Sequence, residues 1–143
     1  MVVGLLEMRI GSIRFSQFEH VMEAMMAWSV EANPQPGYLS IRVVSDADAR
    51  AFEEIIAAIL REIAAHDCSR VLVDIREAKA RPGVLETFGL VSSYSAMQGL
   101  RAAILDRPGN KRWFDFYETV SVNRGHNNRV FTDPEKAIQW LTG

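Results

Sequence analysis

The chain has 143 residues, of which 48% are hydrophobic and 24% are charged, and its formal net charge is −2. These values are typical of one globular domain, and they exclude binding to nucleic acid or anionic membrane through overall charge. Cys68 is the single cysteine, which excludes an internal disulfide and Cys₂-type zinc sites and fits a reducing, cytoplasmic location.

The first 25 residues admit two interpretations. The start MVVGLLEMRIG lacks a basic region, and Glu7 interrupts its apolar run, so neither a signal peptide nor a membrane span is expected. Ser16 and Glu19 have capping-box spacing, which predicts a short amphipathic helix. Methionines near residue 25 also permit a later start. We therefore expect residues 1–25 to be either an extension or an extra helix, and residues 26–143 to form a single domain.

Residues 27–32 and 38–44 alternate apolar and polar side chains on either side of the turn sequence NPQPG, which predicts an antiparallel hairpin. A long helix follows, with Asp46 or Asp48 expected as its cap. Its apolar residues recur at helical spacing on one stripe: Phe52, Ile55, Ile56, Ile59, Leu60 and Ile63. A stripe of this size needs a packing partner, which we expect to be a sheet.

Three short apolar runs predict buried parallel strands: Val71–Val73, Ala102–Leu105 and Val130–Phe131. Helical patterns separate them: one runs from Val84 to Met97, and one begins at Trp113 with Gly125 as a plausible end. The last helix, from Pro134 to Leu141, is expected to be capped by Asp133 or by a capping box between Thr132 and Glu135. The predicted fold class is α/β: a mixed sheet with an N-terminal hairpin, βαβ crossovers and helices packed on the sheet.

Two sequence features connect this order of elements to a known family. They are the strand and acid of Val71-Leu72-Val73-Asp74, and the ending Arg129-Val130-Phe131-Thr132-Asp133 with Ala137-Ile138-x-Trp140-Leu141. From about Met26 onward the chain resembles the SpoIIAA-like, or STAS/SEC14-type, small domains of bacteria. The resemblance implies a binding or regulatory domain that is not an enzyme. Anti-sigma-factor antagonists of the STAS group carry a phosphorylatable serine after this strand, but no Ser or Thr occurs here between Ser69 and Thr87, so no phospho-switch is evident.

Charged residues follow two of the predicted parallel strands and are expected at one edge of the sheet: Asp74, Arg76, Lys79, Arg81, Asp106, Arg107, Lys111 and Arg112. Each group precedes a helix N-terminus, which favours anions. We expect an exposed surface that binds a protein partner or a small anionic ligand. Reversing the charges of Arg76 and Arg81 should then leave folding nearly intact. The alternative is a pair of solvated loops in which both acids pair with nearby arginines.

Two further interpretations remain open. A SEC14-like carrier would hold an apolar or lipid ligand among aromatic and apolar side chains that equally suit a core: Phe88, Met97, Trp113, Phe116 and Tyr117. A weaker alternative is a small hydrolase that uses Asp74 or Asp106. No catalytic residue, metal ligand or cofactor is assigned, because the three histidines lack metal-site spacing and no GxSxG, Walker or GxGxxG motif occurs. The sequence leaves open whether the chain forms a homodimer.

Overall fold

The computed structural model describes residues 27–84, 87, 99–123 and 127–143. The predicted helix at the N-terminus, most of the predicted helix from Val84 to Met97, and the expected helix end at Gly125 lie outside these residues. The division of the chain at residue 25 therefore stays a prediction. Within the described part, no helix is long and apolar enough to cross a membrane.

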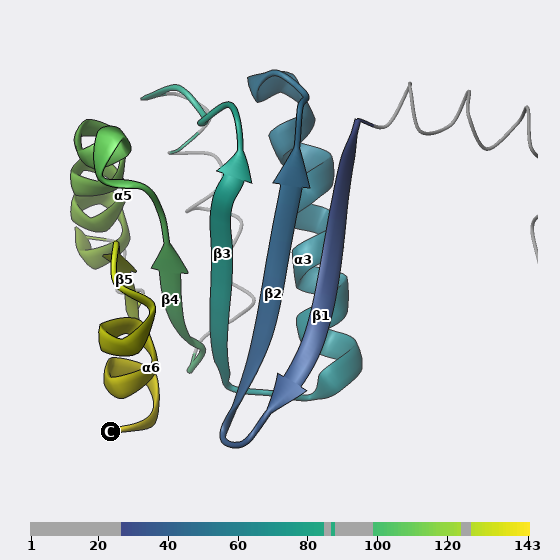
Figure 1. Cartoon of the computed structure of the whole chain (residues 1–143), viewed down its shortest axis with the longest axis vertical. Coiled ribbons are helices and arrows are strands. Elements are labelled where there is room, and N and C mark those ends of the chain that lie inside the picture. The colour runs from purple at the N-terminus through teal and green to yellow at the C-terminus, as the bar shows by residue number, and fades with distance from the viewer. Residues whose placement is uncertain (1–26, 85–86, 88–98, 124–126) are drawn as a thin grey trace, which may run out of the picture.

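A five-stranded mixed sheet, in the order β1-β2-β3-β4-β5, forms the centre of the fold (Figure 1). Its strands are β1 (Trp28–Gln35), β2 (Tyr38–Ser45), β3 (Arg70–Ala78), β4 (Arg101–Leu105) and β5 (Asn127–Phe131). The first pair is antiparallel and the other three pairs are parallel. Gly37, with φ +84°, completes the turn of the hairpin, a conformation that glycine adopts at low cost. The predicted fold class is confirmed.

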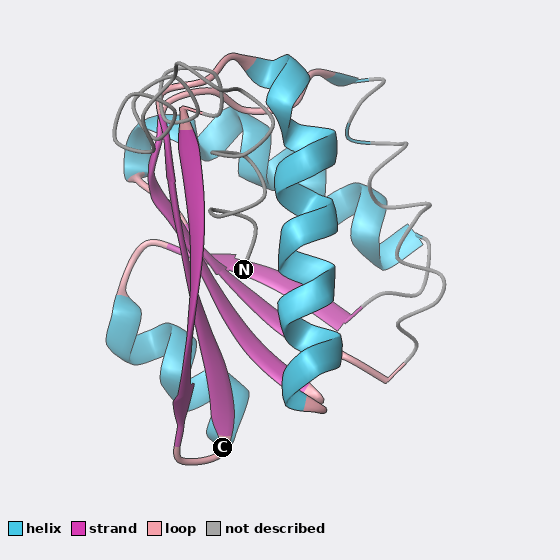
Figure 2. Ribbon diagram, turned by 90° about the vertical axis from the view of Figure 1, so that its right-hand side faces the viewer, coloured by secondary structure: helices cyan, strands magenta, loops and turns pink. Residues whose placement is uncertain are grey.

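Helices cover both faces of the sheet, as Figure 2 shows. On one face, α3 (Phe52–His66) and α5 (Lys111–Asn123) pack on the larger core. Its buried residues include Ile55, Ile59, Ile63, Val71, Val73, Ile104, Tyr117 and Val120. On the other face, α6 (Pro134–Thr142) packs on a smaller core made of Leu72, Ala103, Leu105, Ala137 and Leu141. The predicted apolar stripe of α3 therefore does face the sheet, where each buried large side chain stabilises the fold by about 1.5–3 kcal/mol.

The structure selects one of the two predicted caps of α6 and contradicts the predicted cap of α3. In α6, Asp133 is the N-cap and accepts a hydrogen bond from the backbone N–H of Glu135 at 2.9 Å, so the cap is Asp133 and not Thr132. The predicted aspartate cap of α3 is wrong. Asp48 accepts from the backbone N–H of Arg50 in the short 3₁₀ turn η1 (Ala49–Ala51), and α3 begins after that turn without a side-chain cap.

Strand β3 extends well beyond its predicted apolar run. It continues to Ala78 because Ile75 and Ala78 are also buried against the α3 side of the sheet. Asp74 is therefore a residue within the strand and not at its exit. It lies on the opposite face, next to Arg42 of β2 in register, where the charged side chains are reached by solvent.

Candidate functional site

The loops that follow β3 and β4 lie at the same edge of the sheet, because parallel strands end side by side (Figure 1). We call this region the loop edge and define it as residues 79–84 and 106–112. It includes the short 3₁₀ turn η3 (Pro108–Asn110), which leads directly into α5. All the predicted anion-binding residues except Asp74 and Arg76 belong to the loop edge.

A buried ion pair between Arg81 and Asp106 joins the two loops. The Nε of Arg81 donates to Oδ2 of Asp106 at 3.1 Å, and its Nη2 donates to Oδ1 at 2.5 Å. The Arg81 side chain is 8% exposed and the Asp106 side chain is fully buried. This two-point geometry is the strongest form of an arginine–carboxylate contact. The expectation that Arg81 is an exposed, replaceable charge is therefore wrong.

The Arg81 guanidinium and the Asp106 carboxylate each make further hydrogen bonds. Asp106 also accepts from the backbone N–H of Arg107 at 2.7 Å and from Nδ2 of Asn110 at 2.9 Å. Arg81 also donates to the main-chain oxygens of Ile75, Ala78 and Ala80, at 2.9, 2.6 and 2.7 Å. All five side-chain N–H groups of Arg81 are used, and the Asp106 side chain is fully buried, so the role of the pair is to hold the loop edge together.

The second predicted acid, Asp74, pairs with Arg76. Arg76 donates from its backbone N–H at 3.0 Å and from Nε and Nη2 at 3.0 and 2.8 Å. Burial opposes ionisation of Asp74, but these hydrogen bonds outweigh it and lower the pKa of the carboxyl. Asp74 is level with Leu105 of β4, whose side chain belongs to the core under α6. Asp106 follows the end of β4 and is bonded to Arg81, whose guanidinium lies 5.9 Å from the Trp113 ring on the α5 side of the sheet. The two carboxylates therefore have different arginine partners on different sides of the sheet.

The remaining cations of the loop edge differ in their partners. Lys79 pairs with Asp46 at 3.2 Å, and Lys111 pairs with Asp115 at 2.6 Å, all four side chains being exposed. Arg107 is exposed and makes one long hydrogen bond, 3.5 Å, to the main-chain oxygen of Ala78. Arg112 is exposed and has no ion-pair partner among the described residues. Because exposed pairs are weak and exchangeable, the surface of the loop edge remains cationic.

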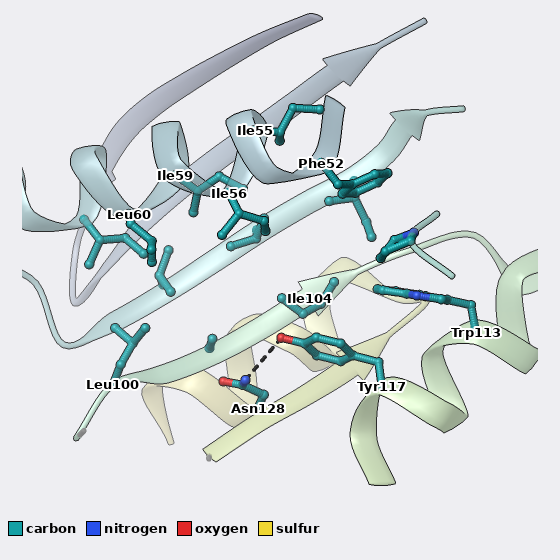
Figure 3. Close-up of a pocket in the computed structure, with 16 residues that line it drawn as sticks. Phe52, Ile55, Ile56, Ile59, Leu60, Leu100, Ile104, Trp113, Tyr117 and Asn128 are labelled. Atoms are coloured by element: carbon teal, nitrogen blue, oxygen red, sulfur yellow. Dashed lines mark hydrogen bonds between the residues drawn. The ribbon is translucent and has the colours of Figure 1, made fainter. Parts of the chain in front are cut away.

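An apolar pocket lies between α3 and α5 over the centre of the sheet (Figure 3). Its volume is about 70 Å³, and its lining includes Phe52, Ile56, Leu60, Ile104, Trp113, Tyr117 and Asn128. The rings of Trp113 and Tyr117 stack with centroids 5.2 Å apart, and Nδ2 of Asn128 donates to the Tyr117 hydroxyl at 3.1 Å. The indole N–H of Trp113 is buried and has no hydrogen-bond partner among the described residues.

The structure separates the five predicted apolar-ligand residues. Trp113 and Tyr117 line the pocket, whereas Phe116 packs against the core next to it. Phe88 and Met97 lie outside the described residues. Sequence reasoning missed two polar members of these sites, Asn110 and Asn128. The position of Asn110 directly before an expected helix was a usable signal, but nothing in the sequence marked Asn128.

A second, more open cleft of about 390 Å³ lies at the other end of the strands from the loop edge. It is formed by the β1–β2 turn and the segment from His66 to Arg70. Burial raises the pKa of the Cys68 thiol, which keeps it protonated at neutral pH and unsuited to nucleophilic attack. Arg70 donates to the main-chain oxygen of Leu141, in the last turn of α6, at 2.8 Å. Among the described residues, no group of three or more His, Cys, Asp or Glu is placed to hold a metal ion.

Comparison with known proteins supports the fold. No protein-family model matches the chain, and no curated protein sequence matches it. Among solved structures, an anti-sigma factor antagonist from Mycobacterium paratuberculosis is similar, with a TM-score of 0.60 and 12% sequence identity over 82% of this chain and 97% of that one. An uncharacterized protein with a SpoIIAA-like fold from Shewanella loihica has a TM-score of 0.52 and 16% identity, over 80% and 94% of the two chains. The chain therefore has a SpoIIAA-like fold, as its sequence resemblance predicted.

Proposed function

We propose that this chain is a non-enzymatic, cytoplasmic regulatory domain that binds a protein partner through the loop edge. The observation that carries the proposal is the buried bridge between Arg81 and Asp106, which holds two loops from separate strands as one preformed surface. A preformed surface loses little conformational freedom on binding. The similar structure from Mycobacterium paratuberculosis is described as an anti-sigma factor antagonist, a protein that acts on another protein, which supports this class of function.

The exposed groups of the loop edge define the partner we propose. Arg107 and Arg112 are exposed cations, and Val84 is an apolar side chain with 60% of its area exposed. Charged side chains steer encounter with a partner of opposite sign, and apolar side chains at the centre supply affinity. The partner surface is therefore expected to combine carboxylates with an apolar group.

Charge reversal tests this proposal. The double variant Arg107→Glu/Arg112→Glu should lose a partner that the wild-type chain captures from lysate of the native host, as measured by quantitative mass spectrometry. The matched control is Arg61→Glu/Lys136→Glu, which makes the same change of net charge at exposed positions on α3 and α6. The control should retain the partner. Equal recovery by the wild type and both variants would contradict binding through the loop edge.

We also propose that partner binding here does not depend on a covalent switch at the loop edge. The first hydroxyl after β3 belongs to Thr87, which is fully buried and donates from Oγ1 to the main-chain oxygen of Gly83 at 2.7 Å. A kinase cannot reach a hydroxyl in this state. Stoichiometric phosphate at Thr87 in protein isolated from the native host would contradict this part of the proposal.

The two alternative functions receive less support. An engineered protein cavity of about 150 Å³ holds a single benzene, so a pocket of about 70 Å³ is too small for a lipid chain unless α3 and α5 move apart. Native mass spectrometry would reveal a retained lipid and would then favour the carrier. A hydrolase with Asp74 and Asp106 as acid and base is disfavoured because the carboxylates occupy opposite faces of the sheet and both are bonded to arginines.

A further inference from the structure

The two edge strands of the sheet differ in how their outer backbone groups are used. At β5, the outward N–H of Val130 donates to Oε1 of Glu118 at 2.7 Å, so a side chain of α5 blocks that edge. Strand β1 pairs with β2 along all eight of its residues without a register shift, and no other described strand pairs with it. Proteins usually protect such an edge with bulges, lysines or prolines. In β1, the protective features of this kind are Pro34, near the end of the strand, and the single charged residue, Glu31.

The alternation of hydrogen-bonded and non-hydrogen-bonded pairs in the hairpin shows which backbone groups of β1 face outward. The N–H of Asp46 donates to the main-chain oxygen of Ala27 at 2.9 Å, so these two residues form a hydrogen-bonded pair. Hydrogen-bonded and non-hydrogen-bonded pairs alternate along antiparallel strands. Trp28, Val30 and Ala32 therefore direct their N–H and C=O groups away from β2. Pro34 has the same phase and lacks the N–H that would otherwise project from the edge.

We propose that β1 pairs with β1 of a second copy of this chain, antiparallel and centred on Val30, to form one continuous sheet across the dimer. A two-fold axis requires a strand to match itself. In this register, outward backbone groups face outward backbone groups, and the large Trp28 lies opposite Ala32 of the partner subunit. Glu31, the one charged residue of β1, lies opposite Ser29 of the partner subunit and not opposite its own copy.

This self-complementary register is the reason to assign the edge to a second copy and not to a strand of another protein. Trp28, Val30 and Ala32 are half-buried beside α3, and the pairing would cover their remaining apolar surface. The loop edge follows β3 and β4, and β2 separates these strands from β1, so pairing at the outer side of β1 leaves the loop edge free. The inference is therefore independent of the proposed function.

Opposite charges at position 29 provide the test. Ser29 is exposed and lies beside Val44 of β2, so its replacement should not alter the monomer. In the dimer, Ser29→Lys places one cation opposite each Glu31, giving two such pairs, and Ser29→Glu places one anion opposite each Glu31. Analytical ultracentrifugation of the full chain should show a dissociation constant that falls with lysine and rises with glutamate, each by about 2- to 30-fold relative to wild type.

A backbone variant supplies the second test. Ala32→Pro removes an outward N–H that the β1–β2 ladder does not use, so it should abolish the dimer while the circular dichroism spectrum remains unchanged. A wild-type chain that stays monomeric up to about 1 mM would overturn the proposal, since weaker association is not specific. Equal dissociation constants for the lysine and glutamate variants would also overturn it. A monomer whose Val30 and Ala32 amides resist hydrogen exchange would assign the edge to another strand and would likewise overturn the dimer.

Discussion

Two arginine–aspartate pairs near the end of β3 contain the same chemical groups in different surroundings. The side chains of Arg81 and Asp106 are 8% and 0% exposed, whereas those of Arg76 and Asp74 are 43% and 19% exposed. The first pair joins residues 25 apart in the chain, and the second joins residues two apart on one strand. The comparison shows that burial and the number of groups satisfied, and not residue type, decide whether such a pair organises a structure.

The largest effect is expected from breaking the buried pair. Arg81→Ala leaves the Asp106 carboxylate buried without a counter-charge and should lower the free energy of unfolding by about 3–5 kcal/mol. Urea denaturation followed by tryptophan fluorescence would measure this, since the Arg81 guanidinium lies 5.9 Å from the Trp113 ring centroid.

Two further variants separate charge from packing at the buried pair. Arg81→Lys keeps the charge but cannot reproduce the two-point contact, so its stability should lie between those of wild type and Arg81→Ala. The double variant Arg81→Met/Asp106→Leu removes both charges and should be more stable than Arg81→Ala. If Arg81→Ala instead lowered the free energy of unfolding by less than about 1 kcal/mol, which is the range of exposed pairs, that result would contradict the proposed difference between the two pairs.

A much smaller effect is expected at the partly exposed pair of Arg76 and Asp74. Arg76→Ala removes the partner of Asp74, but water can solvate the carboxylate that remains. The free energy of unfolding should fall by about 0.2–1 kcal/mol, the range measured for exposed pairs. The same urea titration measures it. A loss as large as that of Arg81→Ala would mean that Asp74 is structurally as important as Asp106.

The pH dependence of stability should reveal the contribution of the pair between Asp74 and Arg76. The pKa of Asp74 is lower in the folded chain than in the unfolded chain, so the unfolded state binds a proton more readily. The stabilisation from this group is therefore complete above the unfolded pKa, about 3.9, and is lost as the pH falls through the lower folded value. Urea midpoints measured across this acidic range should fall less steeply for Asp74→Asn than for wild type. Parallel curves would show that the pair has no net effect.

The smallest effect on stability is expected at the surface of the loop edge. Arg107→Glu/Arg112→Glu changes two exposed side chains, so its free energy of unfolding should stay within about 0.5 kcal/mol of the wild-type value. This result would show that loss of partner binding by the variant reflects the contact surface and not the fold. Marked destabilisation would place Arg107 within the network around Asp106, next to its hydrogen bond to Ala78.

Features that depend on neighbours in sequence could be predicted. The hairpin followed from alternating side chains around the turn sequence NPQPG, although β1 continues to Gln35. The cap of α6 was narrowed to Asp133 or Thr132, and the structure selects Asp133. The apolar stripe of α3 was correctly assigned to the core. The end of β3 was not predicted, because Asp74 and Arg76 looked like a solvated loop. Their side chains point to a part of the sheet that α6 does not cover, and a strand with one open face tolerates charges.

The periodicity of the elements, and with it the α/β class and the crossovers, could be inferred from the order of the residues, as could the presence of charged residues near the ends of β3 and β4. Which of those charges are buried depends on the packing of distant segments. Arg81 and Asp106 meet because parallel strands end at one edge, where η3 and the start of α5 close over them. Burial depends on segments distant in the chain, and removal of water is what changes a weak surface contact into a structural bridge.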